Sequence, residues 1–150
     1  MDITIYTDAD ACPVKSIIDG VAEQYEIPSV FVSSYAHFSA QNYYSKVVMV
    51  DADPEAVDLY ITNQVKPGDV VITQDNGLAV LVLQKGVSAM SPRGSIFSES
   101  DSQALLNGRF EGIQMKRRKI RGRGPSKFKK SDQEAFKIAF LKLLNKPHEQ

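Results

Sequence analysis

The chain has 150 residues, of which 43% are apolar and 24% are charged, and its formal net charge is zero. This size and composition are typical of one globular domain with a sizeable core, and no apolar run approaches the roughly 18 residues that a membrane-spanning helix needs. The N-terminus lacks the basic and apolar segments of a signal peptide, and the single cysteine, Cys12, cannot form an internal disulfide. We therefore expect a cytoplasmic protein with no membrane partner.

The zero net charge conceals one strongly basic segment. Residues 109–130 hold ten of the 18 Lys and Arg residues but only one of the 18 Asp and Glu residues. Such a segment either binds phosphate, nucleic acid or an acidic surface, or is a solvated loop. Gly122, Gly124 and Pro125 exclude a regular helix in its second half, so we predict a basic loop at about 111–130. The candidate contacts to a polyanion such as RNA are Lys116, Arg117, Arg118, Lys119, Arg121 and Arg123.

The first predicted strand, residues 3–7, runs directly into two acids, Asp8 and Asp10. Residues i and i+2 of a strand point to the same side, and the carboxyl ends of strands in open α/β sheets are where ligands bind. Two carboxylates held close together either raise each other's pKa or share a cation. The alternative is that Asp10 only caps the helix predicted over 13–25, which begins at Pro13.

Strands and helices alternate along the rest of the chain. Apolar and β-branched runs predict the strands, and the helical spacing of apolar residues predicts the helices. The further predicted elements are strand 30–32, loop 35–45, strand 47–50, helix 54–65, strand 70–73, helix 78–83, strand 87–90, turn 91–94, helix 99–110 and helix 132–144, the last with a capping box at Ser131 and Glu134. This alternation predicts one three-layer α/β/α domain over residues 1–150, Rossmann-like, with a mostly parallel sheet of about five strands.

Acids follow three of the predicted strands. Besides Asp8 and Asp10, these are Asp51 and Asp53 after strand 47–50 and Asp75 after strand 70–73. A further acid, Asp58, lies about one turn inside helix 54–65. For Asp53 a helix cap is the simpler explanation, because Pro54 follows it. A parallel sheet directs its strand ends to one edge, and an all-oxygen cluster at that edge suits Mg²⁺ or Mn²⁺ rather than zinc.

Six segments have the form of family signatures. They are Asp8-Ala9-Asp10-Ala11-Cys12-Pro13, Val32-Ser33-Ser34-Tyr35-Ala36-His37, Ala56-Val57-Asp58-Leu59-Tyr60-Ile61, Gly68 to Asp75 with Leu78-Ala79, Ser91-Pro92-Arg93-Gly94, and Gly124-Pro125. These segments resemble the YaiI/YqxD family of uncharacterised bacterial proteins, which is grouped with PIN-like domains. Val57 departs from the smaller Ala expected there. The resemblance implies a PIN-like fold, with the catalytic and metal-binding acids of PIN-like nucleases at Asp8, Asp10, Asp58 and Asp75.

An acidic metal site beside a basic segment predicts a polyanionic substrate. In this interpretation carboxylates hold Mg²⁺ or Mn²⁺, a metal-bound water attacks a phosphodiester, and Lys and Arg hold the backbone of an RNA. Arg93, after the fifth predicted strand, is a further candidate for a phosphate contact, although an arginine that stabilises the turn explains it equally well. The sequence leaves the oligomeric state open.

Two other functions fit parts of the same pattern. A phosphatase of the haloacid-dehalogenase type would use Asp8 as nucleophile and Asp10 as acid or base, but Ala11-Cys12-Pro13 departs from the residues expected after that pair. A cysteine phosphatase is disfavoured because Ile18 stands where an arginine is needed. Finally, the domain could be a non-catalytic module that binds RNA or a ribosomal surface through residues 116–130.

Overall fold

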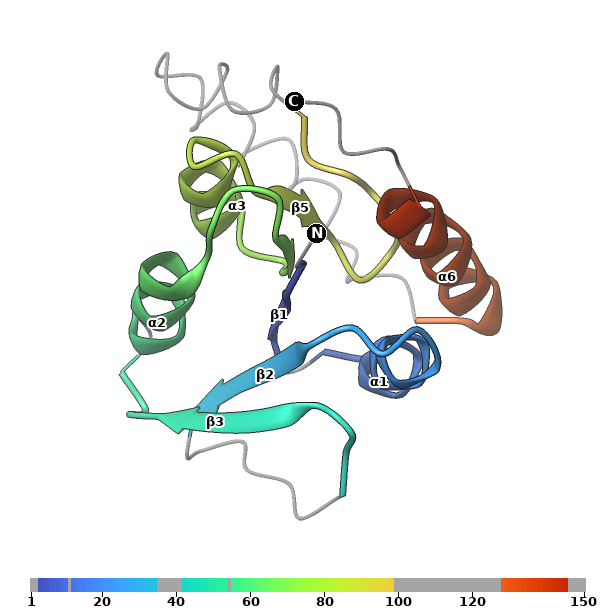
Figure 1. The fold of residues 1–150 in the computed structure, drawn as a ribbon, viewed down its shortest axis with the longest axis horizontal. Helices are drawn as coiled ribbons and strands as arrows, with labels where there is room; N and C mark the ends of the chain where they lie inside the picture. The colour runs from blue at the N-terminus through green and yellow to red at the C-terminus, as the bar shows by residue number, and fades with distance from the viewer. Residues whose placement is uncertain (1–2, 11, 35–41, 54, 99–127, 146–150) are drawn as a thin grey trace.

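The structure is a computed structural model that describes residues 3–10, 12–34, 42–53, 55–98 and 128–145. Its elements are β1 (Ile5–Asp8), α1 (Lys15–Gln24), β2 (Ser29–Ser34), β3 (Lys46–Val50), α2 (Ala56–Gln64), β4 (Val70–Ile72), α3 (Asn76–Leu83), β5 (Ser88–Met90) and α6 (Lys130–Asn145). The strands form one parallel sheet in the order β3-β2-β1-β4-β5, which runs through the middle of the molecule (Figure 1).

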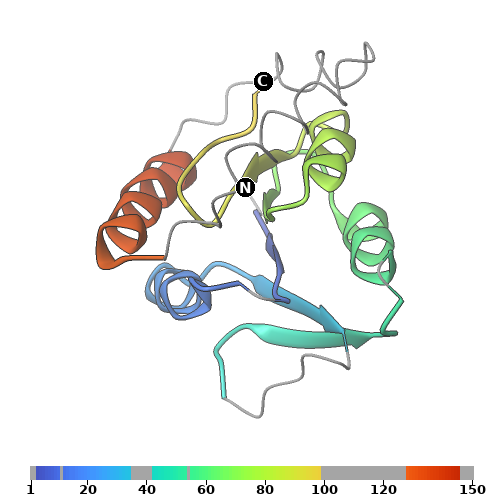
Figure 2. The same cartoon turned by 180° about the vertical axis from the view of Figure 1, so that it is seen from behind.

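Helices cover both faces of this sheet. On one face, Ile18 of α1 and Phe136 and Phe140 of α6 join a buried apolar core. On the other face, Ile61 of α2 and Leu78 of α3 belong to a second core. Both views show α1 with α6 on one side of the sheet and α2 with α3 on the other (Figures 1 and 2). The predicted three-layer α/β/α architecture with a five-stranded parallel sheet is confirmed.

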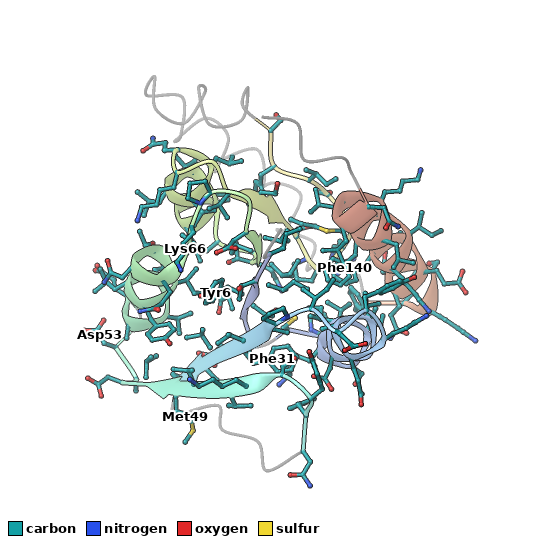
Figure 3. The ribbon with its side chains drawn as sticks, viewed as in Figure 1. Tyr6, Phe31, Met49, Asp53, Lys66 and Phe140 are labelled. Carbon is teal, nitrogen blue, oxygen red and sulfur yellow. The ribbon has the colours of Figure 1, made fainter. Side chains whose placement is uncertain are left out.

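The central strand β1 turns Asp8 toward one particular face. Ile5 lies in the core beneath α1 and α6, whereas Tyr6 packs against the core beneath α2 and α3. Figure 3 shows Tyr6 and Phe140 on opposite sides of β1. Asp8 is in register with Val32, a member of the α2/α3 core. Because strand side chains alternate, Asp8 points to the face that α2 and α3 cover.

The connections that follow β1 and β4 go to opposite faces of the sheet. The helix after β1 is α1, which covers one face, and the helix after β4 is α3, which covers the other. These two strands are direct neighbours. In open parallel sheets, ligands bind at the carboxyl ends of the strands where the connections change direction in this way. The topology therefore makes the end of β1 and β4 the expected functional edge.

Two helices begin later than predicted, which changes the expected role of their acids. α1 begins at Lys15, and its N-cap residue, Val14, makes no side-chain cap bond. The hypothesis that Asp10 only caps this helix is therefore wrong. α2 begins at Ala56 after the N-cap Glu55. Asp53 Oδ1 accepts the Glu55 N–H (2.9 Å) in the preceding turn, so its role is local and close to the predicted cap.

The other two described helices begin earlier than predicted. α3 begins at Asn76, so that Asp75 is its N-cap residue. α6 begins at Lys130, which places Ser131 inside the helix and makes the predicted capping box wrong. The side-chain bond at the start of α6 is made by Asp132 instead, whose Oδ2 accepts the Lys129 N–H (2.8 Å). The predicted helix 99–110 and nearly all of the basic loop 111–130 lie outside the described residues.

The end of α1 contains an unusual backbone conformation. Glu26 has a positive φ of 55°. The Ile27 N–H donates to the Ala22 carbonyl (2.8 Å) and the Glu26 N–H to the Glu23 carbonyl (3.2 Å). These two bonds form a Schellman helix end, whose left-handed position usually belongs to glycine. None of the helices in the described part of the chain is long and apolar enough to cross a membrane.

Candidate active site at the carboxyl edge of the sheet

Asp8 is partly buried at the end of the central strand. The Thr73 hydroxyl donates to Asp8 Oδ2 (3.1 Å), and the backbone N–H of Asp10 donates to the same carboxyl group. Burial raises the pKa of Asp8 to about 6; the charges of Asp10 and Asp75 add to this rise, and the two hydrogen bonds oppose it. Asp8 is therefore mostly ionised at neutral pH, with a pKa suited to a general base.

Asp75 lies beside Asp8, at the start of α3. Its Oδ1 accepts the Leu78 N–H (3.1 Å), which is an N-cap bond. Its own N–H donates to the Thr73 hydroxyl oxygen (3.0 Å). Thr73 is 1% exposed, so this buried hydroxyl joins the ends of β1 and β4. Asp75 thus combines a structural cap with a position next to a second acid.

Asp58 comes to the same place from the first turn of α2. Burial raises its pKa to about 7, helped next by the charge of Asp75 and by a side-chain hydrogen bond between the two carboxyl groups. The charges of Asp8 and Glu55 raise it further. Two carboxyl groups can share a hydrogen bond only while one of them is protonated. The carboxyl groups of Asp8, Asp58 and Asp75 therefore act on one another although they come from three separate segments.

The Asp10 carboxylate faces a different element. Its Oδ1 accepts from the Ser33 hydroxyl (2.8 Å) and from the Ser34 N–H (3.1 Å), both at the end of β2. Both serines are buried. Asp10 thus lies close enough to Asp8 to raise its pKa, but its carboxylate is hydrogen-bonded to the neighbouring strand. This arrangement also disfavours the haloacid-dehalogenase alternative, which needs Asp10 as an acid or base.

Arg93 lies in the turn that follows β5, at the same edge of the sheet but against α6. Its Nη1 atom is 3.3 Å from Asp132 Oδ2, and its guanidinium carbon is 5.3 Å from the centre of the Phe128 ring. A Cβ on Gly94 would lie 3.1 Å from the Ala135 carbonyl oxygen, so this turn packs closely on α6. These contacts match the turn-stabilising alternative, and the predicted phosphate contact stays a prediction.

The remaining predicted site residues and motifs are placed as follows. Lys116, Arg117, Arg118, Lys119, Arg121 and Arg123 lie outside the described residues. Cys12 is buried, and burial raises the pKa of its thiol to about 11. A neutral, buried thiol does not fit a nucleophile, so the structure gives the cysteine phosphatase no support.

Sequence reasoning missed three residues that hold the acids in place. The Thr73 hydroxyl donates to Asp8. The Ser33 hydroxyl and the Ser34 N–H donate to Asp10. Thr73 is the first polar residue after the apolar run of β4 and stands two positions before Asp75, which is the signal that could have identified it. The two serines end β2, and they lie more than 20 positions from Asp10. Their contact depends on the pairing of β1 with β2, which spacing along the chain does not reveal.

The fold and the site together define a parallel α/β protein whose acids gather where β1 and β4 end. The model of the uncharacterised YaiI/YqxD family matches residues 6–146. The chain is 46% identical over 141 residues to a UPF0178 protein of Halalkalibacterium halodurans, which covers 94% of this chain and 90% of that protein. It is 41% identical over 143 residues to a UPF0178 protein of Shouchella clausii, with 95% and 93% covered. No solved structure matches the chain.

The chain therefore belongs to the YaiI/YqxD family, as its sequence motifs predicted. The names of these relatives state no activity.

Proposed function

We propose that the protein is a divalent-metal-dependent nuclease that hydrolyses phosphodiesters, with RNA as its substrate. The observation that carries this proposal is that the carboxyl groups of Asp8, Asp58 and Asp75, from the ends of β1 and β4 and the first turn of α2, act on one another. Among the residues that the structure describes, the charges that act on Asp8 and Asp58 belong to other carboxylates. Like charges held this close destabilise a fold, and such arrangements are concentrated at functional sites.

The chemistry of the three acids fits Mg²⁺ or Mn²⁺, because carboxylate oxygen is the ligand that these ions prefer. Within the described residues, no three His, Cys, Asp or Glu side chains form a group that could hold a metal ion. This result does not exclude such ions, since Mg²⁺ commonly uses one or two carboxylates together with water and substrate phosphates. Asp8, Asp58 and Asp75 are the residues that would hold the ion. The bound ion would supply a water of lowered pKa and a positive charge for the phosphate.

The chain's own groups would carry out the other steps. Asp8, with a pKa of about 6, is mostly ionised at neutral pH and can accept the proton of an attacking water. Thr73 fixes the Asp8 carboxylate through its hydroxyl. The basic segment 109–130 would neutralise the phosphates of the RNA on either side of the cleaved bond.

The test is titration of the full chain with Mn²⁺ and Mg²⁺ by calorimetry, followed by cleavage assays on short RNAs. We expect saturable binding in the wild type and none in the Asp8→Asn/Asp75→Asn double variant. Both amides keep an acceptor oxygen, for the Thr73 hydroxyl and the Leu78 N–H respectively, so the variant should fold. The matched control is Asp53→Asn, which changes an exposed acid at the end of β3 (Figure 3) and should leave binding unchanged.

Two results would contradict the proposal. One is a wild type that binds neither ion, with or without RNA. The other is RNA cleavage that survives in the double variant. RNA binding that persists without cleavage, and without the acids, would favour the non-catalytic binding module instead.

A further inference from the structure

The segment that follows β1 is fastened to β2 rather than to the helix that it enters. The Ala9 N–H donates to the Val32 carbonyl (2.9 Å), and the Cys12 N–H donates back to the Ala9 carbonyl (3.2 Å). Within this short turn, Asp10 supplies the side-chain anchor, since its Oδ1 accepts from both Ser33 and Ser34. Helix α1 begins only at Lys15, and its N-cap residue is Val14.

The same turn carries a group that touches the candidate catalytic acid. The backbone N–H of Asp10 donates to the carboxyl group of Asp8. The direction of that N–H depends on where the turn is held, and the Asp10 side chain holds it against β2. When a group that hydrogen-bonds a metal-binding carboxylate and fixes its orientation is lost, metal affinity or activity commonly falls by about 10–100-fold.

We propose that Asp10 is a positioning residue that acts through Asp8, and that its carboxylate neither binds the metal ion nor transfers a proton. This inference rests on the proposed function. It changes the role that the sequence suggested for Asp10 and leaves three acids, Asp8, Asp58 and Asp75, to do the chemistry. What matters at position 10 is then an acceptor oxygen, and the negative charge is dispensable.

The two roles predict opposite results for one conservative substitution. Asp10→Asn keeps an acceptor oxygen at Oδ1, which makes the two shorter bonds to β2, and loses only the longer contact of Oδ2 with the Ser34 N–H (3.4 Å). Asp10→Ala removes the anchor altogether. We expect Asp10→Asn to retain the Mn²⁺ affinity and RNA cleavage of the wild type within about threefold, and Asp10→Ala to lose about 10–100-fold. Ser33→Ala, which removes the 2.8 Å bond alone, should fall between them.

A second acid in the chain provides a matched control for loss of stability. Asp19 on α1 accepts from the Ser45 hydroxyl (2.6 Å) and the Ser45 N–H (2.8 Å), so it ties a serine at a strand end just as Asp10 does. It lies at the amino end of β3, at the opposite edge of the sheet from the acids. Asp19→Ala should therefore lower the urea midpoint as Asp10→Ala does, while leaving Mn²⁺ affinity and cleavage unchanged.

Each outcome separates this inference from the proposed function. An Asp10→Asn variant as impaired as Asp8→Asn would show that the charge of Asp10 is needed and would overturn the positioning role alone. A folded Asp10→Ala variant with wild-type affinity and cleavage would overturn it as well. A wild type that binds no ion and cleaves no RNA would overturn the proposed function, and this inference with it.

Discussion

The two edges of the sheet use aspartate in opposite ways. At the amino edge, Asp69 is 3% exposed, and its two oxygens accept from backbone N–H groups, Oδ1 from Thr4 (3.0 Å) and Oδ2 from Lys66 (2.8 Å). At the carboxyl edge, Asp58 shares a hydrogen bond with another carboxyl group and lies near two further acids. In the first arrangement, hydrogen bonds stabilise a buried carboxylate, whereas in the second, neighbouring carboxylates repel one another. The difference separates an edge that serves stability from the edge at which we propose that the ion binds.

The largest effect on stability should come from the amino edge. Asp69→Ala leaves two backbone N–H groups without their acceptor, so we expect a loss of about 2–4 kcal/mol in the free energy of unfolding. Urea denaturation would measure this loss. Because Asp69 lies far from the acids in the fold, Mn²⁺ affinity at a temperature where the variant is folded should not change. A loss below about 1 kcal/mol, or a lost ion site, would contradict the division between the edges.

At the carboxyl edge, the free energy of unfolding should depend on pH. The pKa of Asp58 is raised to about 7, so the folded state holds this proton more tightly than the unfolded chain does. Stability from this group is therefore greatest at low pH and falls as pH rises from about 4 to 7. Asp58→Asn should remove that fall and make the protein more stable than the wild type at pH 8, by about 1–2 kcal/mol after allowance for solvent screening.

Urea midpoints at about pH 4.5 and pH 8 test this expectation, with and without Mn²⁺. The ion should stabilise the wild type at the higher pH, because it replaces the shared proton, and should do less for Asp58→Asn. A wild-type stability that rises with pH over this range, at the same rate in both proteins, would count against the conflict between these carboxyl groups.

The smallest effect concerns a position that belongs to the amino edge. Glu26 has a positive φ at the end of α1, a conformation that costs an L-residue free energy and glycine almost none. Glu26→Gly should stabilise the fold by about 0.5 kcal/mol, because the gain is partly offset by the greater freedom of glycine in the unfolded chain. Thermal unfolding would detect the rise, and RNA cleavage should stay as in the wild type.

The sequence allowed the sheet and the acids to be predicted because both follow from local patterns. Asp8 and Asp75 stand directly after apolar runs, and parallel strands bring such ends together. The acid on α2 was also predicted, since a helix that packs back on the sheet returns its first turn to the same edge. These inferences needed only the order of the elements.

The part that sequence reasoning missed depends on contacts between strands. Asp10 looked equivalent to Asp8 because the two are two positions apart, yet its carboxylate turns to β2 and meets Ser33 and Ser34. That turn lies beyond the last residue of β1, where strand alternation no longer applies. The starts of α2 and α6 differ from the predicted ones for a similar reason. Asp53 accepts the Glu55 N–H and Asp132 accepts the Lys129 N–H, and capping rules applied to the sequence do not predict either bond.

The bond between Thr73 and Asp8 joins residues 65 positions apart, and this distance along the chain affects folding kinetics. Asp8 and Asp75 come together only when β1 pairs with β4, and this pairing closes a loop of about 60 residues. A chain that has formed only β1, α1 and β2 carries the repulsion between Asp8 and Asp10 but none of the repulsion from Asp58 and Asp75. We therefore expect this part of the electrostatic cost to arise late in folding, and to hasten unfolding more than it slows folding. A divalent ion at this edge would then act mainly as a kinetic lock, lengthening the lifetime of the native state.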